Sequence, residues 1–323
     1  RKWLCRLSRM GIFNTLVLMN IKHILFLLFF PLFVTAQQEP FLTSFRYQMN
    51  LINPAYAGAE SQNMVAVSSR NQWNAVENSP KNQIITFSSQ RKNNVGLGVS
   101  IGSSKFFVER NTSTYIDFSY RLSVTQNTNL FLGLKGGATF YKADLLGLNS
   151  LGSGVDPAQG LFSRINPNLG VGALLQSESF WLSLSIPRLF SVSNEIDFSA
   201  TSTDKVHSYI ATGAIFKLND FLSIKPSILI RSVEDLGATS EFLGMVGFKQ
   251  FLDIGLSYRT NNSMGIISFI KIKDFLDVGY AYETSVGSAM SNLGVKTHEL
   301  TLRFRLENSG GGEQAEIQET GVN

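Results

Sequence analysis

The sequence predicts an all-β fold, a transmembrane antiparallel β-barrel of about 14 strands with an N-terminal periplasmic or plug segment. Three observations predict it. Segments of about ten residues alternate apolar residues with small or polar ones. After Gln37 there is no run of about 18 apolar residues, which a membrane-spanning helix would need. Aromatic residues gather near the ends of the alternating segments, where the two membrane interfaces would place them.

The composition excludes several classes of protein. Hydrophobic residues make up 44% of the 323 residues and charged ones 16%, against about 25% charged in a soluble globular domain. This balance argues against an intrinsically disordered chain and against a nucleic-acid-binding surface. The formal net charge of +4 comes from residues 1–36, which carry five basic and no acidic residues. The remaining chain is almost neutral, so its charge does not indicate an anionic partner.

Residues 19–36 have the pattern of a cleaved signal peptide. A charged start containing Lys22 precedes an apolar run, and Ala36 ends a small-residue cleavage site. The apolar run is too short for the about 20 residues of a membrane-spanning helix. Residues 1–18 are interpreted as an upstream extension or a mis-called start, and they hold Cys5, the single cysteine of the sequence. We therefore expect an exported mature chain without a disulfide bond.

Residues 37–60 depart from the strand pattern and are predicted to form a periplasmic cap or a lumen plug that docks a partner. Asn53-Pro54 favours a turn, and Gly58 can adopt a positive φ. Aromatic side chains outside a lipid-facing pattern need something to cover them, and large aromatics often dominate protein interfaces. The alternative is that the segment packs inside the barrel mouth and completes the fold. The candidate partner-docking residues of this segment are Phe41, Phe45, Tyr47, Asn53, Pro54 and Tyr56.

Residues 61–306 are predicted to form the barrel. Between residues 114 and 123, Ile116 and Phe118 share the face assigned to lipid, whereas Asp117 and Ser119 share the face assigned to the lumen. The same alternation recurs at the end of the chain. The predicted strands lie near residues 61–76, 82–92, 94–106, 110–124, 128–142, 166–177, 180–189, 206–218, 221–233, 239–250, 252–260, 264–273, 275–284 and 296–306.

The connections are predicted to alternate strictly between short periplasmic turns and longer outer loops. An even strand number places both termini in the periplasm, and twelve or sixteen strands remain alternatives. Residues 307–323, with three adjacent glycines and no basic residue, are predicted to be a flexible acidic tail. Tight connections are placed near residues 92–94, 126–129, 177–179, 218–221, 250–251 and 273–274, and long ones at 143–165, 190–205 and 285–295.

No catalytic, cofactor-binding or metal-binding motif is found, and the protein is not expected to be an enzyme. The glycines near Gly96 and Gly170 neither follow the dinucleotide-binding pattern nor open a helix. The mature chain has two histidines, His207 and His298, both near predicted outer strand ends. A lipid-modifying barrel enzyme would need one of them beside a serine, and this class stays open as an alternative.

The sequence resembles the PorP/SprF family of type IX secretion and gliding-motility outer-membrane proteins of Bacteroidetes. The resemblance is carried by Gln37–Pro40, by Asn50–Gly58 and by Arg70-Asn71-Gln72-Trp73, followed in order by shorter blocks at Leu184–Pro187 and Thr297–Leu300. Arg70 and Trp73 of the third block join the candidate partner-docking residues.

The resemblance implies a non-enzymatic barrel in the outer membrane of a Gram-negative bacterium. Such a barrel would assist secretion, anchoring or presentation of a large surface adhesin within the type IX secretion and gliding machinery. The implied partners are outer-membrane lipid, the secreted adhesin and periplasmic subunits of the secretion machine, with no nucleic acid and no cofactor. A passive outer-membrane porin or a hydrophobic-substrate channel is the alternative that shares the barrel.

Overall fold

The computed structural model describes residues 42–60, 62–74, 76–145, 160–194, 202–234, 237–249, 251–260, 263–286 and 296–306. All of them belong to one compact unit, residues 40–323. The predicted signal peptide, Phe41, most of the predicted long connections and the predicted acidic tail lie outside the described residues. Within the described part of the chain, no helix is long and apolar enough to cross a membrane.

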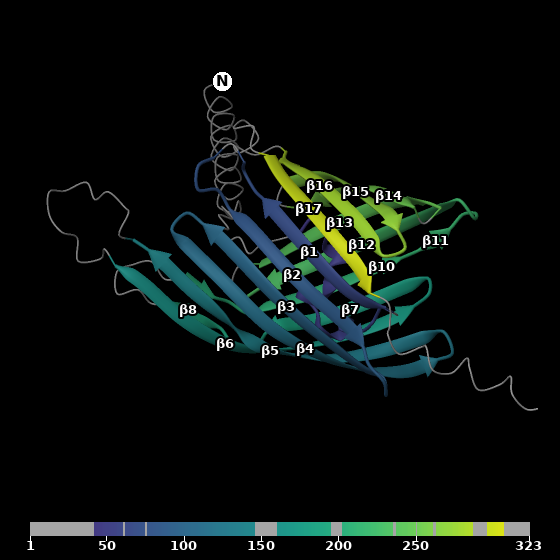
Figure 1. Cartoon of the computed structure of the whole chain (residues 1–323), viewed down its shortest axis with the longest axis horizontal. Helices are drawn as coiled ribbons and strands as arrows, with labels where there is room; N and C mark the ends of the chain where they lie inside the picture. Colours follow the sequence, from purple (N-terminus) through teal and green to yellow (C-terminus); the bar gives the residue numbers. More distant parts are fainter. Residues whose placement is uncertain are drawn as a thin grey trace, which may run out of the picture. The chain divides into compact units, whose positions relative to one another are not determined.

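Among the described residues, fourteen antiparallel strands close into a barrel, which confirms the predicted fold and strand number (Figure 1). β1 closes the ring by pairing with β17, and β10 joins β7 to β12. The barrel strands are β1 (Asn63–Asn71), β2 (Lys81–Gln90), β3 (Val95–Phe106), β4 (Glu109–Thr125), β5 (Thr128–Asp144), β6 (Leu161–Ser177), β7 (Phe180–Arg188), β10 (His207–Ala214), β12 (Leu222–Val233), β13 (Gly237–Phe248), β14 (Leu252–Arg259), β15 (Ser263–Lys273), β16 (Leu276–Ser285) and β17 (Lys296–Leu306).

Three short strands accompany the barrel. β11 (Phe216–Lys217) continues along β12 after β10 has ended. β8 (Val192–Asn194) and β9 (Ser202–Asp204) pair with each other in the connection between β7 and β10.

The two faces of the strands differ as the alternation predicts. On β4, Ile116 and Phe118 are 61% and 43% exposed, whereas Asp117 and Ser119 are almost completely buried. The apolar side chains therefore point out of the barrel, and the small and charged ones point into its lumen. An outer face this rich in exposed apolar side chains requires a surrounding lipid phase.

The two ends of the barrel carry different connections. The turn end is the end at which β1 begins and β17 ends, and the six predicted tight connections lie there. At the opposite end, the loop end, the predicted strict alternation is wrong, because Phe107 and Val108 alone join β3 to β4. Two neighbouring antiparallel strands can be joined by a two-residue hairpin at either end of a barrel. Phe107 has a positive φ of 52°, which such a tight turn uses.

Two strand boundaries differ from the prediction. β1 ends at Asn71, and Trp73, which was placed on the first strand, lies in the connection after it with a positive φ of 56°. An extended strand cannot continue through that conformation. β6 begins at Leu161, inside the predicted loop 143–165, and pairs with β5 as far as Asp144.

Candidate functional site: the plugged lumen

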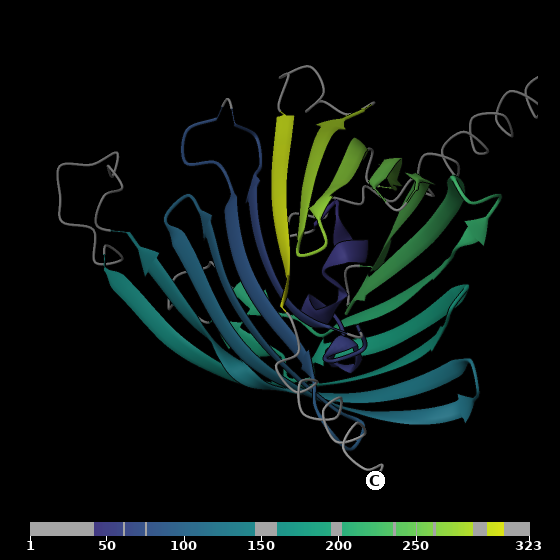
Figure 2. The same ribbon diagram turned by 45° about the vertical axis from the view of Figure 1, so that its right-hand side comes forward.

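Residues 42–60, the plug, fold inside the barrel as three short 3₁₀ helices (Figure 2). They are η1 (Phe45–Tyr47), η2 (Met49–Leu51) and η3 (Pro54–Tyr56). The predicted turn at Asn53-Pro54 is the start of η3, where the Asn53 side chain accepts a hydrogen bond from the Ala55 N–H at 2.8 Å. Gly58 has a positive φ of 67°, as the sequence suggested.

The plug buries its large side chains against the lumenal face of the barrel. Phe45 is 4% exposed, Met49 3% and Tyr56 9%. They form one apolar cluster with lumenal side chains of the wall, including Phe131 and Trp181. The premise that the plug aromatics stand exposed and need a partner to cover them is therefore wrong for Phe45 and Tyr56, since the barrel itself covers them.

Glycines of the wall make room for the plug backbone. A Cβ added at Gly133 would lie 2.2 Å from the Ala55 nitrogen, and one added at Gly172 would lie 1.9 Å from the Asn53 Oδ1. Side chains cannot occupy those positions while the plug is seated. The small residues on the lumenal face of β5 and β6 are thus explained by the close approach of η3.

A network of buried charges, the loop-end latch, holds the first residues of the plug. The Arg70 guanidinium donates to Glu299 at 3.1 Å and to Glu283 at 3.0 Å. Glu299 also accepts the backbone N–H groups of Thr43 at 2.9 Å and Ser44 at 3.1 Å. The arginine neutralises carboxylates that in turn bind plug backbone, so the latch joins β1, β16 and β17 to the plug.

Further polar contacts fix the middle of the plug. The Asn53 Nδ2 donates to the Ala173 carbonyl at 2.9 Å and to the Ser183 hydroxyl at 2.8 Å. Lys135, buried in an ion pair of 2.7 Å with Asp117, donates to the Asn50 carbonyl at 3.3 Å. A buried cation that is paired and hydrogen-bonded in this way positions the backbone that it contacts.

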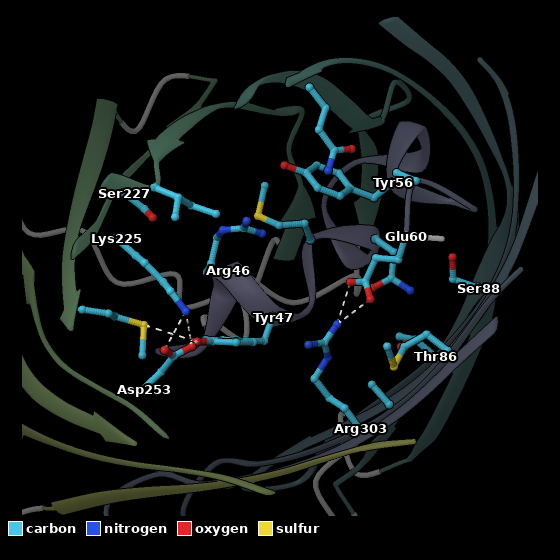
Figure 3. A pocket seen from close by; sticks show the side chains of 18 of the residues that line it. Arg46, Tyr47, Tyr56, Glu60, Thr86, Ser88, Lys225, Ser227, Asp253 and Arg303 are labelled. Carbon is cyan, nitrogen blue, oxygen red and sulfur yellow. Dashed lines mark hydrogen bonds and ion pairs between the residues drawn. The ribbon is translucent and has the colours of Figure 1, made fainter. Parts of the chain in front are cut away.

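The turn-end half of the lumen contains a cavity of about 260 Å³ between the plug and the wall (Figure 3). Two ion pairs line it. Arg303 of β17 contacts Glu60 of the plug at 2.6 Å, and Lys225 of β12 contacts Asp253 of β14 at 2.6 Å. The Tyr47 hydroxyl donates to the same Asp253 at 2.7 Å. The cavity is therefore walled by residues of the plug on one side and of the barrel on the other.

Tyr56 and Arg46 also line this cavity. Burial raises the pKa of the Tyr56 phenol well above its ordinary value, and the nearby Arg46 charge only partly opposes that rise. The Tyr56 hydroxyl consequently stays protonated. It approaches Ser183 without a hydrogen bond of ordinary geometry.

The structure brings most candidate docking residues together, but inside the lumen. Phe45, Asn53, Pro54 and Tyr56 are buried, and Tyr47, which is partly buried, stacks on Phe269 with ring centroids 3.6 Å apart. Arg70 lies in the loop-end latch. Trp73 lies apart from them, in the connection after β1, and packs edge-on against Phe106 at the end of β3.

Sequence reasoning missed the residues that hold the plug in place. Glu283 and Glu299 stand at lumen-facing positions of regular strands, and Asp117 does the same on β4. The available signal was an acidic residue at a lumen-facing position of an alternating strand. The partners of these acids could not be read from the sequence, because they lie on other strands.

Both histidines pack beside tyrosine side chains of the described strands. The His298 Nδ1 is hydrogen-bonded to the Tyr280 hydroxyl at 2.7 Å, and His207 packs beside Tyr209 with ring centroids 6.3 Å apart. No group of three or more histidine, cysteine or acidic side chains is arranged to hold a metal ion within the described ranges.

Comparison with known proteins identifies relatives of the whole plugged barrel. Residues 34–304 match the family described as "Type IX secretion system membrane protein PorP/SprF". No curated protein sequence matches the chain.

Solved outer-membrane proteins are similar to the chain at low sequence identity. The Acinetobacter baumannii outer membrane protein Omp33 is 11% identical with a TM-score of 0.44, covering 76% of this chain and 99% of that one. The monoaromatic hydrocarbon channel CymD is 10% identical with a TM-score of 0.48, covering 81% and 93%. A Pseudomonas aeruginosa FadL homologue is 10% identical with a TM-score of 0.43, covering 79% and 93%.

Proposed function

Because the chain belongs to the PorP/SprF family of type IX secretion system membrane proteins, we propose that it assists secretion, anchoring or presentation of a large surface adhesin. The protein is an outer-membrane component of type IX secretion. We propose in addition that it handles an adhesin, that it works within the gliding machinery, and that it is exported by a cleaved signal peptide.

The family match carries this proposal. It spans residues 34–304, so it includes the plug, the first thirteen barrel strands and β17 as far as residue 304. The plug is thus part of the matched unit and not a segment added to a generic barrel. A function that needs both the barrel wall and the plug is therefore more consistent with the matched range than a function of the wall alone.

The plug inside the lumen supports a protein-handling function and argues against a passive porin or a hydrophobic-substrate channel. The plug contacts β14 through Tyr47 and Asp253, β17 through Glu60 and Arg303, and β5 and β6 through η3. These contacts join the plug to separate parts of the wall, and a cavity of about 260 Å³ lies beside the plug at the turn end. A porin needs a continuous aqueous path through the barrel.

We propose further that the protein is not an enzyme. Several charged side chains of the lumen, among them Arg70, Glu299 and Arg303, are used in contacts that seat the plug, which gives them a structural role. Partner docking by Phe45, Tyr47, Asn53, Pro54, Tyr56, Arg70 and Trp73 stays a prediction. Since most of these side chains are buried, a partner would reach them only after the plug has moved.

The test combines genetics with purification. Deletion of the gene should abolish surface display of one adhesin while other outer-membrane barrels assemble normally, and the wild-type gene should restore display. Affinity purification of the tagged barrel from native outer membranes should recover periplasmic secretion subunits. Normal display in the deletion strain, together with steady ion conductance of the purified barrel in planar bilayers, would instead establish the porin alternative.

A complementing variant tests the plug directly. Replacement of both Pro54 and Tyr56 by Ala should leave a heat-modifiable barrel in the outer membrane while adhesin display falls. Failure of the barrel to assemble would show that the segment serves folding. Normal assembly with normal display would move the docking surface to the loop-end connections 143–165 and 190–205.

A further inference from the structure

We propose that the turn-end cavity binds a monocarboxylate that carries an apolar group, with Arg46 as the residue that holds the carboxylate. This inference goes beyond the proposed function and does not depend on it. It rests on the charges, the unused polar atoms and the lining of the cavity.

Arg46 is the cation of this cavity that has no acidic partner among the described residues. The two other cations, Arg303 and Lys225, are paired with Glu60 and Asp253. The Arg46 guanidinium instead lies over the Trp181 ring, 4.8 Å from its centroid. Figure 3 shows it reaching into the cavity, with no interaction drawn to it. The described lining therefore carries three positive and two negative charges.

An arginine without an acidic partner can bind an anion. A guanidinium has five N–H donors in a plane and matches a carboxylate with two parallel hydrogen bonds. The aromatic face below it favours the cation without using those donors. The Arg46 nitrogens are not enclosed, so water can bond to them, and a bound carboxylate would replace that water with charge-assisted hydrogen bonds.

Two further polar atoms of the lining have no hydrogen-bond partner of ordinary geometry among the described residues. They are the Tyr56 hydroxyl and the Gln176 Oε1. The protonated Tyr56 hydroxyl can donate to a carboxylate oxygen, while the Gln176 oxygen accepts from an N–H or O–H group of the ligand. A peptide that ends in a free carboxylate offers both kinds of group.

The remaining lining selects the rest of the ligand. Met49, Met64, Met245 and Ile215 supply an apolar and adaptable wall. The carboxylates of Glu60 and Asp253 lie in the same cavity and would repel a doubly charged phosphate more strongly than a singly charged carboxylate. The site therefore fits an apolar C-terminal residue of a peptide, or an alkyl carboxylate.

The cavity lies in the turn-end half of the barrel. It is lined by late residues of β2 and β17 and early residues of β12 and β14, all of them in the turn-end half of their strands. Glu60 at its rim is exposed. With the predicted topology, this end faces the periplasm.

Calorimetric titration of the purified full-length protein in detergent tests the proposal. The probes are acetyl-leucyl-valine with a free carboxylate, the same dipeptide as its amide, and hexanoate. The wild type should bind the free dipeptide, whereas the amide should bind at least about tenfold more weakly, since it cannot form the charged pair. This comparison requires no variant, so it is independent of any folding defect.

Matched variants locate the binding. Arg46→Gln should weaken binding of the free dipeptide at least about tenfold, and Arg46→Lys should retain part of it. Arg121→Gln is the control, because Arg121 is a cation of the turn-end rim that bonds to Asn94 away from the cavity. It should bind as the wild type does. Each variant is first checked for heat-modifiable migration, which reports a folded barrel.

The outcomes are distinct. Tighter binding of the dipeptide than of hexanoate identifies a chain terminus as the ligand, and equal binding identifies an alkyl carboxylate; both support the carboxylate site. Binding of the amide as tight as that of the acid, equal binding by Arg46→Gln, or displacement of the dipeptide by millimolar inorganic phosphate would overturn it. None of these results depends on adhesin display.

Discussion

Replacement of Gly133 by Ala should loosen the plug without breaking the barrel. The added Cβ would lie 2.2 Å from the Ala55 nitrogen and 2.5 Å from the Pro54 carbonyl carbon, both of which are backbone atoms. An ordinary contact begins near 3.4 Å. The plug must therefore retreat by about 1 Å at η3, since the hydrogen-bonded wall yields less than a segment tethered by its ends.

The cost has two sources. Overpacking by one methyl group in a well-packed interior typically costs about 1–3 kcal/mol. The retreat also strains the 2.8 Å hydrogen bond from the Ala55 N–H to Asn53 Oδ1, and a lost hydrogen bond costs about 0.5–1.5 kcal/mol. We expect plug docking to be weakened by about 2–4 kcal/mol in total.

Urea titration in detergent measures this effect. Tryptophan emission in a Trp73→Phe background comes from Trp181, which packs edge-on against Tyr56, and reports plug release. Heat-modifiable migration reports the barrel. In Gly133→Ala the fluorescence transition should occur at lower urea, while the migration transition should stay near its wild-type position.

Gly136→Ala supplies the matched control on the same strand. Its added Cβ would face outward, and the nearest atom, a Leu169 methyl carbon, would be 3.6 Å away, an ordinary contact. Release of the plug at the same urea concentration in both variants would show that η3 does not pack against Gly133 of β5.

Three further predictions follow from the barrel and its latch. Single cysteines at Asn149, in the connection between β5 and β6, and at Asn127, at the turn end, should differ on whole cells. A membrane-impermeant maleimide should label the first and not the second, and the reverse result would invert the topology. Phe118→Arg should lower the free energy of unfolding in lipid vesicles by about 2–4 kcal/mol if the site is near the bilayer midplane, and an unchanged value would show that this face does not meet lipid. Glu299→Gln should weaken attachment of the first plug residues by about 3–5 kcal/mol, because Arg70 loses half of its buried charge partners; limited proteolysis should then cut the plug earlier than in wild type, and equal cutting rates would argue against the latch.

Local patterns were sufficient to predict the wall. Ile116 and Asp117 are neighbours in sequence and face lipid and lumen in the structure, because successive side chains of any strand point to opposite sides. The tight turns were visible for the same reason, since residues such as Asn93 and Asn94 carry the positive φ of a hairpin in their own backbone. The connection lengths at the loop end were less predictable, because a turn as short as Phe107-Val108 has no distinctive sequence.

Such local patterns could not predict the contacts inside the barrel. Arg70 meets Glu283 and Glu299 only because β1 closes on β17, which brings together residues more than 200 positions apart in the chain. A glycine such as Gly133 appears in the sequence as one more small lumenal residue, and its role depends on the plug backbone beside it.

The sequence by itself determined the barrel and the existence of a separate segment before the first strand, and it predicted about 14 strands with twelve or sixteen as alternatives. Each of these follows from the alternation and turn chemistry of a few neighbouring residues. Only the tertiary structure decided that this segment lies inside the lumen with its aromatics covered, which charges hold it there, and that Arg46 is left facing a cavity. These features depend on barrel closure and strand register, which set the distances between residues that no local pattern connects.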